Sequence, residues 1–129
     1  MAENVFIGRQ PYKGAIIDWA KAEEDSAKLF KQLGVELDPK RIARGLSIAD
    51  QQVVEIAKAL SMDAKVILMD EPTAALSASE VERLMTVMRN LRDSNKAVIF
   101  VSHRLDEVFA ISDYITVMRD GATVSEAKT

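Results

Sequence analysis

A chain of 129 residues with 48% hydrophobic and 29% charged residues is long enough to form a globular domain with its own core. Its net charge of −3 argues against nucleic acid or an anionic membrane as a direct partner, and the absence of cysteine excludes disulfides and thiolate metal sites. No apolar run approaches the length that spans a bilayer, so we expect any membrane role to depend on a partner protein.

The first third of the chain is predicted to be mostly helical. Glycine and proline interrupt residues 1–15, which we expect to form a short helix or turn followed by a loop. A helix is predicted over 16–33, ending at Gly34, and a second, short helix over 38–45 after an Asp-Pro start. The apolar face of the longer helix carries Ile16, Trp19, Ser26, Ala27, Phe30 and Leu33.

The next helix is predicted to begin at Ser47, whose side chain can cap the first turn, with Asp50 adding favourable negative charge. Its buried stripe consists of Val53, Ile56, Ala57 and Leu60. The apolar run 65–69 then predicts a strand buried on both faces of a parallel sheet.

The second half of the chain predicts a strand–helix–strand order, typical of an α/β fold. Ser77 and Glu80 form a capping box before a helix whose core side is Val81, Leu84, Met85, Met88 and Leu91. A second apolar strand covers 97–101, and a short helix carrying Leu105, Val108 and Phe109 follows it. A third strand covers 114–118, and Asp120-Gly121 predicts a hairpin turn into a fourth.

Two adjacent carboxylates, Asp70 and Glu71, follow the first strand, at the end where α/β proteins place ligands. In nucleoside triphosphatases the first such acid holds magnesium, usually through water, and the second orients the attacking water. His103, the only histidine, follows the second strand and could reach the same ligand. Solvated carboxylates and a structural histidine are the alternatives that each motif leaves open by itself.

Ser47 also has two interpretations. A serine at a helix start is usually a cap, but the same position can place a hydroxyl and backbone amides against a phosphate. Considered alone, this residue favours the cap.

Three segments taken together resemble the ATP-binding-cassette (ABC) ATPase family. They read L-S-I-A-D-Q-Q-V-V-E-I-A-K-A-L, then V-I-L-M-D-E-P-T-A-A-L-S, then V-I-F-V-S-H-R-L-D-E-V, in the order of the family's signature motif, Walker B strand with D-loop, and histidine switch. The match covers residues 46–121, and the opening M-A-E-N-V-F-I-G-R-Q-P looks like the segment after the family's glutamine loop. The sequence of these segments is most similar to the first cassette of tandem ATP-binding subunits in ribose-, galactose- and xylose-type sugar importers.

The resemblance implies a role for each motif. Asp70 would hold Mg²⁺ through water, Glu71 would be the general base, and His103 would contact the γ-phosphate of ATP. The signature, which would face the nucleotide of a second cassette, is Leu46, Ser47, Ile48, Ala49, Asp50 and Gln51. The D-loop, which would cross the interface between cassettes, is Ala74, Ala75, Leu76 and Ser77.

The chain departs from the family in three places. The usual glycine pair of the signature is Ile48-Ala49, Asp50 replaces a glutamine, and Ser77 replaces the D-loop aspartate. We therefore expect one of two composite ATP sites to be weakened. The phosphate-binding pattern G-x-x-x-x-G-K-S/T is absent, so the sequence predicts a fragment that starts downstream of that loop and is inactive alone.

The expected fold is accordingly the C-terminal part of a P-loop NTPase core, residues 62–129, preceded by a helical subdomain over 1–61. By family topology a strand is missing between 97–101 and 114–118, so we expect self-association or direct closure of the gap. Expected partners are a second cassette, a permease and, indirectly, a periplasmic or extracellular sugar-binding protein, with the chain peripheral on the cytoplasmic face of the membrane. A non-catalytic interaction module is the alternative; a chromosome- or repair-type cassette would need long coiled coils or a basic surface.

Overall fold

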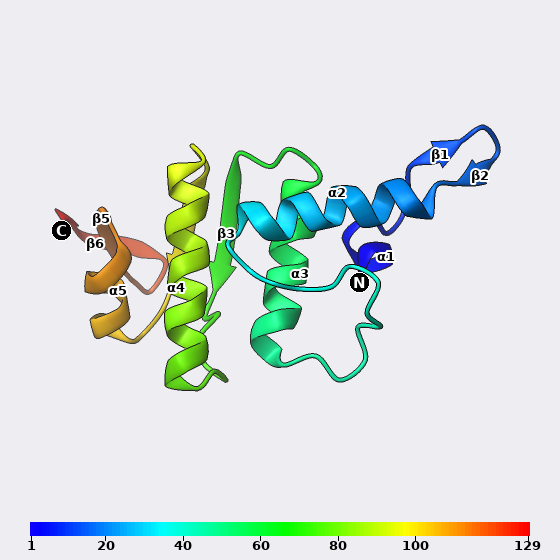
Figure 1. The fold of residues 1–129 in the computed structure, drawn as a ribbon. Coiled ribbons are helices and arrows are strands. Elements are labelled where there is room, and N and C mark those ends of the chain that lie inside the picture. The colour runs from blue at the N-terminus through cyan, green and yellow to red at the C-terminus, as the bar shows by residue number, and fades with distance from the viewer.

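The computed structural model describes residues 1–129, with five helices and six strands (Figure 1). The elements of the first half are α1 (Ala2–Val5), β1 (Tyr12–Lys13), β2 (Ile16–Ile17), α2 (Trp19–Gln32) and α3 (Ile48–Leu60). Those of the second half are β3 (Val66–Asp70), α4 (Ala78–Asp93), β4 (Ala97–Val101), α5 (Leu105–Ile111), β5 (Tyr114–Arg119) and β6 (Ala122–Lys128).

The predicted helix over 16–33 starts later than expected. Residues 16–17 pair with 12–13 in a small hairpin, which projects away from the rest of the chain (Figure 1). Asp18 then caps α2 by accepting a hydrogen bond from the Lys21 N–H at 2.9 Å. Ile16 and Trp19 are consequently exposed, whereas Ser26, Phe30 and Leu33 lie on the buried face as expected.

The short helix predicted over 38–45 is wrong. The Asp38 carboxylate accepts from the Lys40 N–H at 2.9 Å, a local turn that competes with helix formation. The Pro39 carbonyl accepts from the N–H of Ala2 at 2.9 Å, so α1 uses an acceptor that a helix would have needed. This segment runs as turns and irregular backbone to the start of α3.

The two caps read from the sequence are confirmed. Ser47 Oγ accepts from the Asp50 N–H at 3.1 Å, so α3 begins where it was predicted. Glu80 Oε2 accepts from the Ser77 N–H at 3.0 Å and starts α4. The predicted core sides of both helices are buried. They meet the inner face of β3 in one core that also includes Phe30 and Leu33 of the α2 region.

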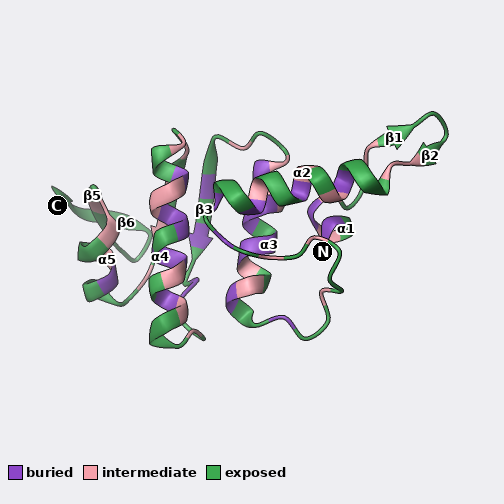
Figure 2. Ribbon diagram, in the orientation of Figure 1, coloured by how far each residue is buried: buried purple, intermediate pink, exposed green.

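Strands β3 and β4 form a parallel pair in register from Val66↔Ala97 to Asp70↔Val101. β3 lies between α3 and α4, but its predicted burial on both faces is wrong (Figures 1 and 2). Ile67 and Met69 are buried, whereas Leu68 is 67% exposed. The reason is that α3 and α4 cover one face of the strand, and no element of the chain covers the other.

The Asp120-Gly121 turn is confirmed: both residues have positive φ, 51° and 76°, and β5 and β6 form an antiparallel hairpin. This hairpin stays separate from the β3–β4 pair, so the gap between β4 and β5 is not closed by direct pairing. None of the helices is both long and apolar enough to cross a bilayer.

Candidate functional site

The side chains of Glu71 and His103 meet at the carboxyl ends of the two parallel strands. Asp70 is in register with Val101, and the Glu71 N–H continues the ladder by donating to the Val101 carbonyl at 2.9 Å. His103 follows two residues after Val101, and its Nδ1 lies 3.1 Å from Glu71 Oε1. The parallel pairing predicted from the sequence therefore does bring the acid and the histidine together.

Glu71 has an unusual backbone conformation. Its φ is +44°, in the left-handed region that side chains disfavour. The other three non-glycine residues with positive φ are aspartates or asparagine, which tolerate this region better. Strain of this kind, about 1–3 kcal/mol, gathers at functional sites. The turn that follows it is closed by the Ala74 N–H, which donates to the Glu71 carbonyl at 3.2 Å.

Asp70 presents an exposed carboxylate that takes part in no ion pair or side-chain hydrogen bond. No group of three or more His, Asp or Glu side chains converges on a common metal position. This donor set fits Mg²⁺, which commonly keeps several waters and uses one or two carboxylates together with substrate phosphates. It does not fit a metal held by protein side chains alone.

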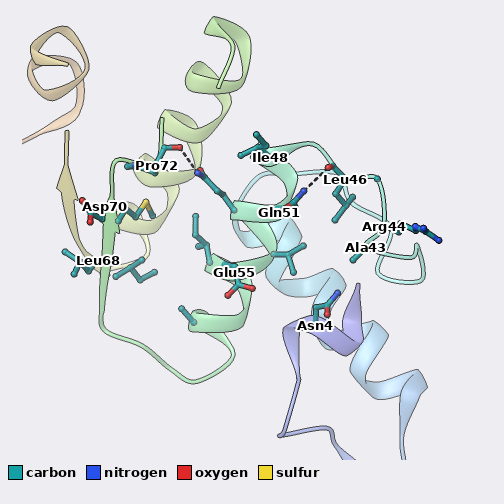
Figure 3. A pocket seen from close by; sticks show the side chains of 17 residues that line it. Asn4, Ala43, Arg44, Leu46, Ile48, Gln51, Glu55, Leu68, Asp70 and Pro72 are labelled. Atoms are coloured by element: carbon teal, nitrogen blue, oxygen red, sulfur yellow. Dashed lines mark hydrogen bonds between the residues drawn. The ribbon is translucent and has the colours of Figure 1, made fainter. Parts of the chain in front are cut away.

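The acid–histidine pair lies on an open surface. The side chains of Glu71 and His103 are 52% and 70% exposed. A pocket of about 820 Å³ lies instead between α3, the 43–46 loop and β3, and only Asp70 of the three residues lines it (Figure 3). The candidate site lies at the strand ends, because Glu71 and His103 contact each other there.

The predicted signature residues occupy the start of α3. Leu46 and Ala49 are buried in the core, Ile48 is exposed, and Gln51 Nε2 donates to the Leu46 carbonyl at 3.0 Å. Asp50 Oδ1 lies 2.7 Å from Arg83 Nη1, so its negative charge is paired within the chain. Leu46, Ile48 and Gln51 line this pocket together with Asp70 (Figure 3). The hydrogen bond and ion pair of Glu71 and His103 are with each other and not with a signature residue.

The predicted D-loop, residues 74–77, begins in the turn at 72–75, where Ala74 and Ala75 are exposed. Ser77 takes part in the α4 cap. Hydrogen bonds to Glu80 from the Ser77 N–H and, with a smaller effect, from its hydroxyl hold the pKa of Glu80 below its ordinary value. Gln52 Nε2, in the segment that resembles the signature motif, donates to the Pro72 carbonyl at 2.6 Å and connects α3 to this turn.

Sequence reasoning also missed a buried polar cluster beside the site. Thr73 Oγ1 donates to Glu107 Oε2 at 2.6 Å, and Glu107 Oε1 lies 2.7 Å from Arg104 Nη1. A charged residue in the first turn of a short helix gave no signal that it would be buried, since such residues are usually solvated.

Comparison with known proteins identifies the class to which this fold and strand-end site belong. The family model described as ABC transporter matches residues 1–74, and the chain belongs to this family. It is 59% identical over 126 residues to the ribose import ATP-binding protein RbsA 1 of Streptomyces coelicolor, covering 97% of this chain and 25% of that protein. It is 44% identical over 128 residues to the xylose import ATP-binding protein XylG of Thermoanaerobacter pseudethanolicus, covering 99% and 25%.

The fold, like the sequence, is similar to that of ABC proteins. The solved structure of MJ1267, an ATP-binding cassette of an ABC transporter, superposes with a TM-score of 0.82 at 27% identity, covering 98% of this chain and 54% of that one. The α/β fold with a parallel strand pair is thus that of part of a P-loop NTPase cassette, as the sequence predicted. The chain spans about a quarter of the length of the curated relatives described above.

Proposed function

We propose that this chain acts as part of the ATP-hydrolysing subunit of an ABC importer for a pentose-type sugar. The observation that carries the proposal is the contact between Glu71 and His103 at paired strand ends, 3.1 Å apart beside the exposed Asp70. A carboxylate and an imidazole in contact can orient a water molecule, and either group can accept or donate a proton during the reaction. The relatives named for ribose and xylose import support the substrate class.

In this proposal the three side chains have separate roles. Glu71 orients and deprotonates the attacking water, and His103, in contact with Glu71, donates toward the γ-phosphate. Asp70 would hold Mg²⁺ through water, and the ion, when bound with ATP, would neutralise charge that develops on the phosphates. The phosphate-binding pattern G-x-x-x-x-G-K-S/T occurs nowhere in these 129 residues, so we expect the chain alone neither to bind ATP tightly nor to hydrolyse it.

The partners follow from the same reasoning. The start of α3, with Ser47 and Ile48 exposed, would face nucleotide held by a second cassette, and Ala74–Ala75 of the D-loop would cross between the cassettes. Within the helical part, residues 1–61, residues 1–45 would contribute to docking on a permease at the cytoplasmic side of the membrane, and residues 62–129 would contribute the catalytic strand ends. A sugar-binding protein outside the cytoplasm would act only through the permease.

A non-catalytic interaction module is the second candidate. The observation that favours it is the unusual signature, in which Asp50 adds a carboxylate and Ile48-Ala49 replaces a flexible pair. If the chain is such a module, a change of Glu71 should cause no loss of any ATP-dependent activity.

The decisive experiment uses a polypeptide in which this chain is joined to a phosphate-binding half-cassette. Glu71→Gln is expected to lower ATP turnover by about a hundredfold or more, because a positioned general base contributes roughly 10²–10⁴-fold. Binding of a fluorescent ATP analogue should change by less than about twofold, since the amide keeps the shape of the side chain. Glu82→Gln, at an exposed position on α4, is the matched control. Turnover in Glu71→Gln equal to that of the control would favour the interaction module.

A further inference from the structure

The only buried residue of helix α5 is a charged one, Glu107, which is 4% exposed. A buried carboxylate is costly unless its oxygens are paired. Here Oε2 accepts from Thr73 Oγ1 at 2.6 Å, whereas Oε1 makes an ion pair with Arg104 Nη1 at 2.7 Å and no hydrogen bond. Thr73 is itself only 2% exposed. The attachment of α5 to the rest of the domain therefore combines this buried polar contact with the partly buried Ile111, which packs against the core.

These three residues connect the two segments that carry the acid–histidine pair. Thr73 is two residues after Glu71, and Arg104 is the residue after His103. Thr73 and Glu107 are 34 residues apart in sequence, so their contact joins the turn after β3 to the helix after β4. The path from Glu71 through Thr73, Glu107 and Arg104 to His103 closes into a ring through the 3.1 Å Glu71–His103 contact.

The acid–histidine contact cannot hold itself in place. Both side chains are mostly exposed, and exposed pairs contribute little to stability. The backbone of Glu71 is anchored by its bond to the Val101 carbonyl at 2.9 Å, but the His103 side has only a local turn, in which the Arg104 N–H donates to Ser102 Oγ at 3.0 Å. The tertiary anchor nearest to His103 is thus the buried carboxylate of Glu107.

We infer that Thr73, Glu107 and Arg104 form a positioning brace that holds His103 against Glu71. The inference rests on the proposed function for its consequence in catalysis, but its geometry can be tested independently. The three brace residues contact neither ATP nor the attacking water. They act by fixing the distance between Glu71 and His103, which do. A displacement of about 1 Å in such a pair can lower turnover by roughly a hundredfold.

The first experiment measures geometry in the 129-residue chain. His103 is the only histidine, so the NMR signals of its ring need no assignment by mutation. In the wild-type chain a nuclear Overhauser effect is expected between the His103 Cε1 proton and the Glu71 Cγ protons. Thr73→Val, which keeps the side-chain shape and removes the hydroxyl, should abolish it, whereas Thr73→Ser, which keeps the hydroxyl, should retain it.

A folded Thr73→Val chain with the full Overhauser effect would overturn the brace. Should Thr73→Val fail to fold, Arg104→Met provides the same test, because the Arg104 side chain is 43% exposed and methionine keeps an unbranched apolar chain in its place. Loss of the effect in Arg104→Met supports the brace, and its retention overturns it.

The second experiment measures catalysis in the joined polypeptide described above. Thr73→Val should lower kcat for ATP at least about tenfold and change KM by less than about twofold, with recovery in Thr73→Ser. An unchanged kcat in a variant that has lost the Overhauser effect would remove the positioning role. Absence of ATPase activity in the wild-type joined polypeptide would instead refute the proposed function, and the NMR comparison would still decide whether the brace exists.

Discussion

Arg83 Nη1 of α4 lies 2.7 Å from Asp50 Oδ1 in the first turn of α3. Asp50 is the residue at which the predicted signature carries an added negative charge, and its side chain is only 15% exposed. The ion pair neutralises the added carboxylate and joins the two helices that cover β3. The departure is thus accompanied by a structural compensation, which the sequence alone did not reveal.

Loss of this ion pair should destabilise the chain moderately. Arg83→Gln and Asp50→Asn are each expected to lower the free energy of unfolding by about 1 kcal/mol, the range for a partly exposed pair. The double variant should lose less than the sum, because both changes remove one interaction. Urea unfolding measures all three, and Arg92→Gln, whose Asp93 pair is mostly exposed, should change by less than about 0.5 kcal/mol. Strict additivity of the two changes would show that the pair contributes nothing.

Gly34 joins the end of α2 to α4 through a close approach. A Cβ at Gly34 would lie 2.5 Å from Asn90 Nδ2, the group that donates to the Leu33 carbonyl at 2.9 Å. Gly34→Ala should therefore cost about 1 kcal/mol for its positive φ and about 1 kcal/mol more for the displaced hydrogen bond.

Gly8→Ala is the matched control for this change, because Gly8 has the same φ of +73° and nothing within 4 Å of an added Cβ. The difference between the two glycine variants in thermal unfolding should disappear when Asn90→Ala is added to both. If the difference between the two glycine variants persists in the absence of the Asn90 side chain, the contact with Asn90 is not its cause.

The capping box of α4 should make stability depend on pH. Hydrogen bonds from the N–H and then the hydroxyl of Ser77 hold the pKa of Glu80 below its ordinary value. Because the folded state favours the ionised carboxylate, this stabilisation is present above the ordinary pKa of glutamate and is lost as pH falls through the lowered value. Urea midpoints at pH 7 and pH 3 should therefore differ less in Glu80→Gln than in the wild-type chain. An equal difference in both would exclude a contribution from the cap.

The uncovered face of the β3–β4 pair should cause the chain to self-associate. Leu68 and Ile99 are directly opposite each other in register and are 67% and 52% exposed. Apolar faces and free strand edges of this kind promote association. The double change Leu68→Lys and Ile99→Lys should shift the species seen by analytical ultracentrifugation toward the monomer. Ile42→Lys, at a 77% exposed loop position, should leave the distribution unchanged. A monomeric wild-type chain at high concentration would contradict this prediction.

Local features were readable from the sequence because their causes lie within a few residues of one another. The caps at Ser47 and Ser77, the turn at Asp120-Gly121 and the strand–helix–strand order all follow from neighbouring side chains. The meeting of Glu71 with His103 was also predictable, since parallel pairing places successive strand ends side by side. The failed helix at 38–45 shows the limit of this approach: an Asp-Pro pair suits both a helix start and a turn, and the bond from Ala2 to Pro39 decided between them.

The sequence by itself thus determined the family, the order of the elements from α3 onward and the identity of the groups at the strand ends. Only the tertiary structure decided that β3 buries one face, that Asp50 is paired with Arg83 and that Glu107 is buried against Thr73. The physical reason is that burial and ion pairing depend on which distant segments pack together. A residue type and its neighbours in sequence carry no record of a partner that lies 33 or 34 positions away.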